Sequence, residues 1–134
     1  MIKNLKQHHI GCLVHDIEAF KAENQAVWTA DKYSQVFAIA SQDVKVCFLQ
    51  TTEDTRIELV EPGISNKPLS RLLTKGITYY HIGFISDSYD ISVADLLNIR
   101  CIQISEFNSE AFEGKRCAFF YHPQLRLIEL IEED

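Results

Sequence analysis

The sequence predicts an α+β protein made of two tandem βαβββ modules, whose strands form a curved, partly closed mixed sheet with a metal site in its concave face. Two repeated phrases predict this duplication. His-Ile-Gly at residues 9–11 returns at residues 81–83, 72 residues later (81 − 9). Ile-Glu-Leu at residues 57–59 returns at residues 128–130, 71 residues later (129 − 58). Two motifs that each recur after nearly the same number of residues are typical of two copies of one unit.

The first module, predicted at about residues 7–62, begins with a strand and a helix. Apolar and β-branched residues predict a strand over residues 8–14. Asp16 can cap a helix, which Ala, Glu and Lys favour over residues 17–28. After a polar loop, three more strands are predicted, separated by polar turns and ended by Pro-Gly, at residues 35–40, 44–50 and 56–61.

A connector over residues 63–78 is expected to hold a short helix at residues 69–74, which Lys-Gly would end. The second module, about residues 79–134, then repeats the order of the first. A strand, a helix and three strands are predicted at residues 79–86, 91–99, 101–104, 116–121 and 125–131, with a loop at 108–114.

Composition restricts the possible functions. The 134 residues suit a single domain over residues 1–134. A net charge of −6 argues against nucleic-acid binding, which needs clustered basic residues. The chain lacks a signal-like apolar N-terminus and a stretch of ~20 apolar residues, so we expect a cytoplasmic protein without a membrane partner. We expect reduced and mostly buried thiols at Cys12, Cys47, Cys101 and Cys117.

Of the five histidines, the repeat selects two. Side chains alternate between the faces of a strand, so His8 and His9 point to opposite sides. His9 matches His81, whereas His8 matches Tyr80, so His8 is expected to be a surface or packing residue. His15 and His122 are expected to have surface roles, with contact to a substrate as the alternative.

Two acidic residues recur with the histidines. Glu58 follows His9 by 49 residues and Glu129 follows His81 by 48 (58 − 9 and 129 − 81). Either acid alone would be expected on the solvent side of a strand, but that does not explain the recurrence. Two imidazoles and two carboxylates suit a divalent ion such as Zn²⁺, Co²⁺, Ni²⁺ or Mn²⁺. The other recurring acids are expected to face solvent at strand ends: Glu61 and Glu132.

These motifs and the paired βαβββ units resemble the vicinal oxygen chelate superfamily, which includes glyoxalases, bleomycin-resistance proteins and dioxygenases. The chain is most similar to the methylmalonyl-CoA epimerases within it. The stretches that carry this resemblance are residues 43–49 before 56–62, 67–76 before 80–83, and 114–123 before 127–130. The resemblance implies one divalent metal held by His9, Glu58, His81 and Glu129.

The chain departs from this family in the first module. Residues 24–29 lack the Leu-Gly pair of most relatives, and residues 40–43 lack the Pro-Glu-Gln-Gly-like turn of epimerases. The pocket beside these segments is therefore expected to differ, which leaves the acyl group open.

The resemblance implies a metal-dependent epimerase or isomerase of an acyl thioester, acting through a metal-stabilised enolate. Glu129 is the first choice for the proton-transferring carboxylate and Glu58 the second. Two alternatives are a lactoylglutathione lyase of the glyoxalase I type and a small-molecule-binding resistance protein. Basic contacts to a coenzyme A carrier, or else a solvated helix face, are expected from Lys67, Arg71 and Lys75. A homodimer is plausible because curved sheets have edges to protect.

Overall fold

The computed structural model of the chain describes residues 4–133, which form two compact units. The first unit holds residues 9–80, and the second holds residues 81–133 together with residues 4–8. The chain passes from one unit to the other inside β1, directly before His9, and again inside β5, directly before His81. Both predicted ligand histidines therefore begin the portion of a strand that belongs to a new unit.

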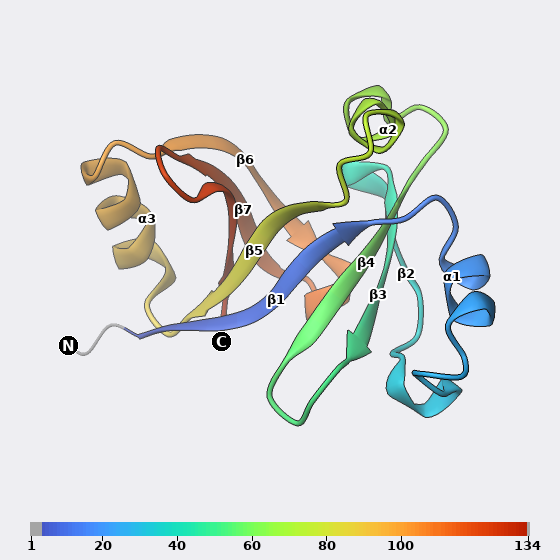
Figure 1. Cartoon of the computed structure of the whole chain (residues 1–134). Helices are drawn as coiled ribbons and strands as arrows, with labels where there is room; N and C mark the ends of the chain where they lie inside the picture. The colour runs from blue at the N-terminus through green and yellow to red at the C-terminus, as the bar shows by residue number, and fades with distance from the viewer. Residues whose placement is uncertain (1–3, 134) are drawn as a thin grey trace. The chain divides into compact units, whose positions relative to one another are not determined.

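The first unit contains a mixed set of four strands in the order β2-β3-β4-β1 (Figure 1). β1 runs parallel to β4, and the other neighbours are antiparallel. Its helices and strands are β1 Leu5–Leu13, α1 Ile17–Glu23, β2 Phe37–Ile39, β3 Val44–Gln50, β4 Arg56–Pro62 and α2 Lys67–Thr74, with 3₁₀ turns at Ala30–Lys32 and Ala40–Gln42.

The second unit repeats this arrangement in the order β5-β8-β7-β6, with β5 parallel to β8. Its elements are β5 Tyr79–Ser86, α3 Tyr89–Asn98, β6 Ile102–Ser109, β7 Lys115–His122 and β8 Arg126–Glu132, with a 3₁₀ turn at Glu110–Phe112. Asn4 joins it through paired hydrogen bonds with Asp87. The predicted α+β class with two βαβββ modules is confirmed.

Each unit buries one face of its strands under its first helix. In the first unit Ile17 of α1 packs with Cys47 and Leu59. In the second unit Tyr89 and Leu96 of α3 pack on β7 and β8, against Ala118, Phe120, Ile128 and Leu130. Because side chains alternate along a strand, the residues between these positions lie on the opposite face, and that face carries the recurring Glu residues.

The prediction that the first helix extends to residue 28 is wrong. Asp16 caps α1 as predicted, since its carboxylate accepts a hydrogen bond from the Ala19 N–H at 2.8 Å. The helix ends at Glu23, because both the backbone N–H and the side-chain amide of Asn24 donate to the Phe20 carbonyl. An Asn that bonds its own helix end in this way competes with continuation of the helix.

The connector helix begins two residues earlier than predicted. The Asn66 side chain accepts a hydrogen bond from the Leu69 N–H at 3.2 Å and so caps α2 at Lys67. Pro68 fits in the first turn, where no N–H is needed. Gly76 follows the helix with φ +79°, a left-handed conformation that favours glycine.

The strand predicted at residues 101–104 is also longer than expected. β6 runs to Ser109 and occupies the edge of its strand set, with a bulge between Gln103 and Ser105. Its exposed face carries Glu106 and Asn108, and these polar residues obscured the strand pattern. β5 has the predicted bounds, and the remaining strands differ from their predictions by a few residues at most.

Among residues 4–133, no helix has both the length and the apolar character that crossing a membrane requires.

Candidate metal and substrate site

The first unit brings His9 and Glu58 together on one face of its strands. Glu58 on β4 lies in register with Gly11 on β1 and with Phe48 on β3. His9 Nε2 lies 3.6 Å from Glu58 Oε1. Both residues are buried, with 1% and 4% of their surface exposed. The Phe48 ring lies 5.7 Å from the His9 ring, so one aromatic side chain flanks this pair.

The second unit builds the same arrangement from its own strands. Glu129 on β8 lies in register with Gly83 on β5 and with Phe119 on β7. His81 Nε2 lies 3.5 Å from Glu129 Oε1, and each residue is 4% exposed. The Phe119 ring meets the His81 ring edge-on at 5.2 Å. The duplication therefore extends from the ligand types to their registers and flanking aromatic residues.

Each pair offers one imidazole nitrogen and one carboxylate oxygen as potential metal ligands. Burying a carboxylate is costly unless a charge or hydrogen-bond donors compensate it. A divalent cation supplies such a charge, and nitrogen with oxygen ligands suits the borderline ions Zn²⁺, Co²⁺ and Ni²⁺ as well as Mn²⁺. The donor atoms and burial of both pairs therefore fit a metal ion.

The other histidines have structural positions. His8 is half-buried and meets the Phe112 ring edge-on at 5.1 Å, in agreement with its predicted packing role. His15 is exposed, as predicted. His122 is half-buried in the β7–β8 turn, where its Nδ1 accepts hydrogen bonds from the Gln124 and Leu125 N–H groups, each at 3.0 Å. The surface role predicted for His122 is thus replaced by stabilisation of a hairpin.

The prediction that Glu61 and Glu132 face solvent is wrong, because each is half-buried and bonded within its own unit. Glu61 accepts a hydrogen bond from the Ile17 N–H at 2.9 Å, at the start of α1. Glu132 pairs with the Arg116 guanidinium at 2.8 Å. Both acids recur because a βαβ unit places the end of its last strand beside the first helix.

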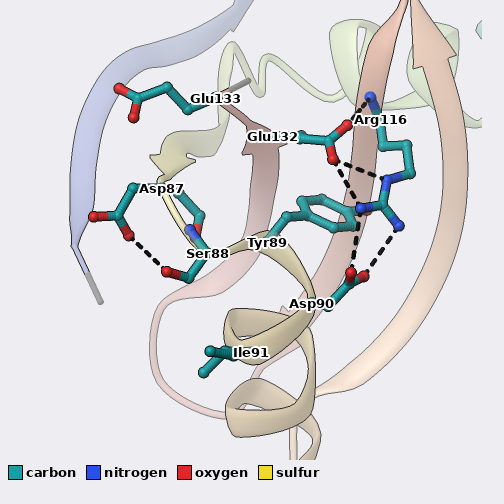
Figure 2. Close-up of a pocket in the computed structure, with 9 residues that line it drawn as sticks. Asp87, Ser88, Tyr89, Asp90, Ile91, Arg116, Glu132 and Glu133 are labelled. Atoms are coloured by element: carbon teal, nitrogen blue, oxygen red, sulfur yellow. Dashed lines mark hydrogen bonds and ion pairs between the residues drawn. The ribbon is translucent and has the colours of Figure 1, made fainter. Parts of the chain in front are cut away.

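The second unit also contains a pocket of about 320 Å³ at the N-terminus of α3 (Figure 2). Arg116 lies at its wall between Asp90, at 3.0 Å, and Glu132. Its guanidinium stacks over the Tyr89 ring, 4.4 Å from the centroid. These contacts tie α3 to β7 and β8. The sequence analysis missed this cluster, since its residues are far apart in the chain.

The charges of this cluster shift the pKa values of their neighbours. Hydrogen bonds from Arg116 lower the pKa of Glu132, and those to Glu132 and Asp90 raise the pKa of Arg116. Burial, followed by its hydrogen bond to Glu106 at 2.9 Å, raises the pKa of Tyr89. At neutral pH the Arg116–Glu132 pair is therefore an ionised structural anchor beside the neutral Tyr89 phenol.

All four cysteines are free thiols, three of them buried, as predicted. Burial raises the thiol pKa of Cys12, Cys47 and Cys101. A raised pKa reduces the thiolate fraction, so these groups are poor nucleophiles and poor metal ligands at neutral pH. The basic residues of the connector are exposed on and after α2: Lys67, Arg71 and Lys75.

A family model described as the glyoxalase/bleomycin resistance protein/dioxygenase superfamily matches residues 8–132. The match spans both modules and every predicted ligand. The chain therefore belongs to this superfamily, as its repeated motifs indicated. None of the curated proteins matches the chain in sequence.

Solved structures of similar fold include several methylmalonyl-CoA epimerases. A Streptomyces coelicolor epimerase in complex with 2-nitronate-propionyl-CoA is 24% identical, with a TM-score of 0.76 over 97% of this chain and 96% of that one. The Mycobacterium tuberculosis epimerase is 18% identical, with a TM-score of 0.78 over 96% and 88%. A hypothetical protein from Bacillus halodurans C-125 is 24% identical, with a TM-score of 0.77 over 98% and 96%. At these identities the likeness shows the shared fold.

Proposed function

We propose that the two His–Glu pairs bind one divalent ion in a single domain, and that the protein is a metal-dependent epimerase or isomerase of an acyl thioester. The observation that carries this proposal is the exact duplication of the pair, including the Gly and Phe partners of each Glu. A carboxylate that only faced solvent would not need burial, an adjacent imidazole and the same register in both modules.

The proposed reaction moves a proton at the carbon next to the thioester carbonyl. A bound divalent ion would stabilise the negative charge that develops on the substrate oxygens as this proton leaves. Glu129 takes the proton on a carboxylate oxygen, and Glu58 is the second candidate for returning it to the opposite face.

The similar structures support an acyl-CoA substrate, because the Streptomyces coelicolor epimerase is described with a propionyl-CoA derivative and another epimerase with methylmalonyl-CoA. Exposed basic residues on and after α2 would contact the phosphates of such a carrier. A cytoplasmic location and a homodimer belong to the same proposal, and light scattering of the purified protein tests the dimer.

The reaction is tested by incubating Co²⁺-loaded protein with a methylmalonyl thioester in deuterated water. We expect deuterium at the α-carbon, detected by mass spectrometry, and its loss in a Glu129→Gln variant that still binds Co²⁺. No exchange, together with turnover of a methylglyoxal–glutathione adduct, would instead establish the glyoxalase I-type lyase. Binding of small molecules without either reaction would indicate a resistance-type binding protein.

A further inference from the structure

The two modules differ beside their ligand pairs at one matched pair of positions. On β8, Leu127 precedes Glu129 by two residues and lies in register with Tyr121 on β7. On β4, the equivalent position is Arg56, in register with Gln50 on β3. Residues two apart on a strand share a face. Apolar and aromatic side chains thus adjoin Glu129, whereas basic and amide side chains adjoin Glu58.

The apolar side of the second module extends across three strands. Phe119 lies in register with Ser105 and Glu129, and its ring stacks on Phe107 at 5.8 Å. Neither phenylalanine is fully buried. The aromatic wall, defined here as Phe107, Phe119, Tyr121 and Leu127, lies on the face opposite to the core under α3.

This wall has the burial expected of a surface that receives an apolar group. Its members are half-buried or exposed, with Tyr121 at 41%, while the core residues of the opposite face are almost fully buried. Leu127 and Glu129 are two positions apart on the strand, a distance of about 7 Å. An apolar substituent that starts at the reacting carbon beside Glu129 would cover this length.

Building on the proposed function, we infer that the substrate carries an apolar substituent longer than a methyl group next to its metal-binding oxygens, and that the aromatic wall binds it. The repeat fixes the orientation, because only the second module offers an apolar surface at this position. In the first module the Gln50 amide donates to carbonyls of the β3–β4 turn, so Gln50 and Arg56 offer a polar rather than an apolar surface there. Leu127 and Tyr121 are therefore the specificity-determining residues of this site.

Hydroxamates provide a direct probe, since each presents the same two vicinal oxygens to a metal while the carbon chain varies. We expect Co²⁺-loaded protein to bind hexanohydroxamate at least about tenfold more tightly than acetohydroxamate, because each fully buried methylene contributes about fourfold. The visible spectrum of bound Co²⁺ reports this binding without catalysis. Leu127→Ala, or Leu127→Arg to copy the first module, should abolish most of the preference for the longer chain.

Leu97→Ala is the matched control, since it removes an exposed leucine from α3, on the other side of the strands. It should keep the full preference for the longer chain. Equal affinities of the wild type for both probes, or a preference that survives in both Leu127 variants, would overturn the aromatic wall but leave the metal site intact. Failure of the wild type to bind Co²⁺ or acetohydroxamate would overturn the proposed function itself and this inference with it.

Discussion

Glu58 and Glu129 are buried carboxylates whose only neighbours in strand register are a glycine and a phenylalanine. Each phenylalanine ring also contacts the histidine ring of its pair. Such a position is costly for a charged group without a partner. The nearby imidazoles, at 3.6 and 3.5 Å, and the proposed ion together provide one.

Replacement of one proposed ligand histidine tests whether that residue binds the ion. We expect His81→Ala to weaken Co²⁺ affinity by more than about 100-fold, since residues that merely orient ligands already contribute 10–100-fold. Isothermal titration with Co²⁺ measures the effect. His8→Ala is the control, since His8 packs against Phe112 and should keep wild-type affinity. Unchanged affinity in His81→Ala would remove this residue from the site.

The Arg116 cluster gives a pH-dependent prediction. Arg116 lowers the pKa of Glu132 in the folded chain, so the ion pair stabilises the protein fully above the unfolded Glu pKa of about 4.3. That stabilisation is lost as the pH falls through the lower pKa that Glu132 has in the folded chain. Glu132→Gln should therefore unfold a few degrees below the wild type at pH 7, and the difference in Tm should shrink in acid. A difference that grows below pH 4 would contradict this assignment.

Among the elements, the first helices of the two modules begin differently. Asp16 caps α1 with its side chain, and Glu61 adds a second acceptor at Ile17. α3 has no side-chain cap from Ser88, and its equivalent acid, Glu132, turns to Arg116. The recurring acid therefore has a different partner in each module. Glu61 bonds the start of α1, whereas Glu132 bonds Arg116 on β7.

The contribution of the N-terminal residue to stability can be compared between α1 and α3. Asp16→Ala should lower the free energy of unfolding by about 1 kcal/mol, because it leaves the Ala19 N–H without its acceptor. Ser88→Ala should have a clearly smaller effect, since the Ser88 hydroxyl bonds Asp87 instead of the helix. Urea unfolding of both variants measures the difference. Equal losses would show that the Asp16 bond contributes little.

Elements were predictable to different degrees for identifiable reasons. The bounds of β5 were predictable because Tyr, Ile and Phe dominate residues 79–85. The end of α1 was missed because Asn24 side-chain bonding depends on the helix already being formed. β6 was truncated in the prediction since an edge strand exposes polar residues that resemble a loop.

At the scale of the whole molecule, each compact unit contains one His–Glu pair, and the chain crosses between units at His9 and His81. If both pairs bind one ion, metal binding must stabilise the entire chain rather than one half. The number of ions bound per chain therefore tests the proposal that both modules form one domain.

We expect one Co²⁺ per chain by elemental analysis, and a chelator should lower the Tm in a single cooperative transition. Free metal at 100 times its Kd would contribute about 2.7 kcal/mol to stability. Glu58→Gln and Glu129→Gln should each weaken the same ion. Two ions per chain, or loss of stabilisation in only one of two separate transitions, would show that the pairs act independently.

The repeated phrases alone determined the fold class, the duplication, and the choice of His9, Glu58, His81 and Glu129, because a βαβββ unit can be recognised from local periodicity and the second copy checks the first. Tertiary structure determined which residues lie side by side, which the repeated motifs do not show. The Glu61 bond depends on how α1 packs beside the end of β4, while the Glu132–Arg116 bond and the pairing of Leu127 with Tyr121 depend on strand register. Register determines which side chains of neighbouring strands lie beside each His–Glu pair. It therefore shows that the neighbours are polar in the first module and apolar in the second.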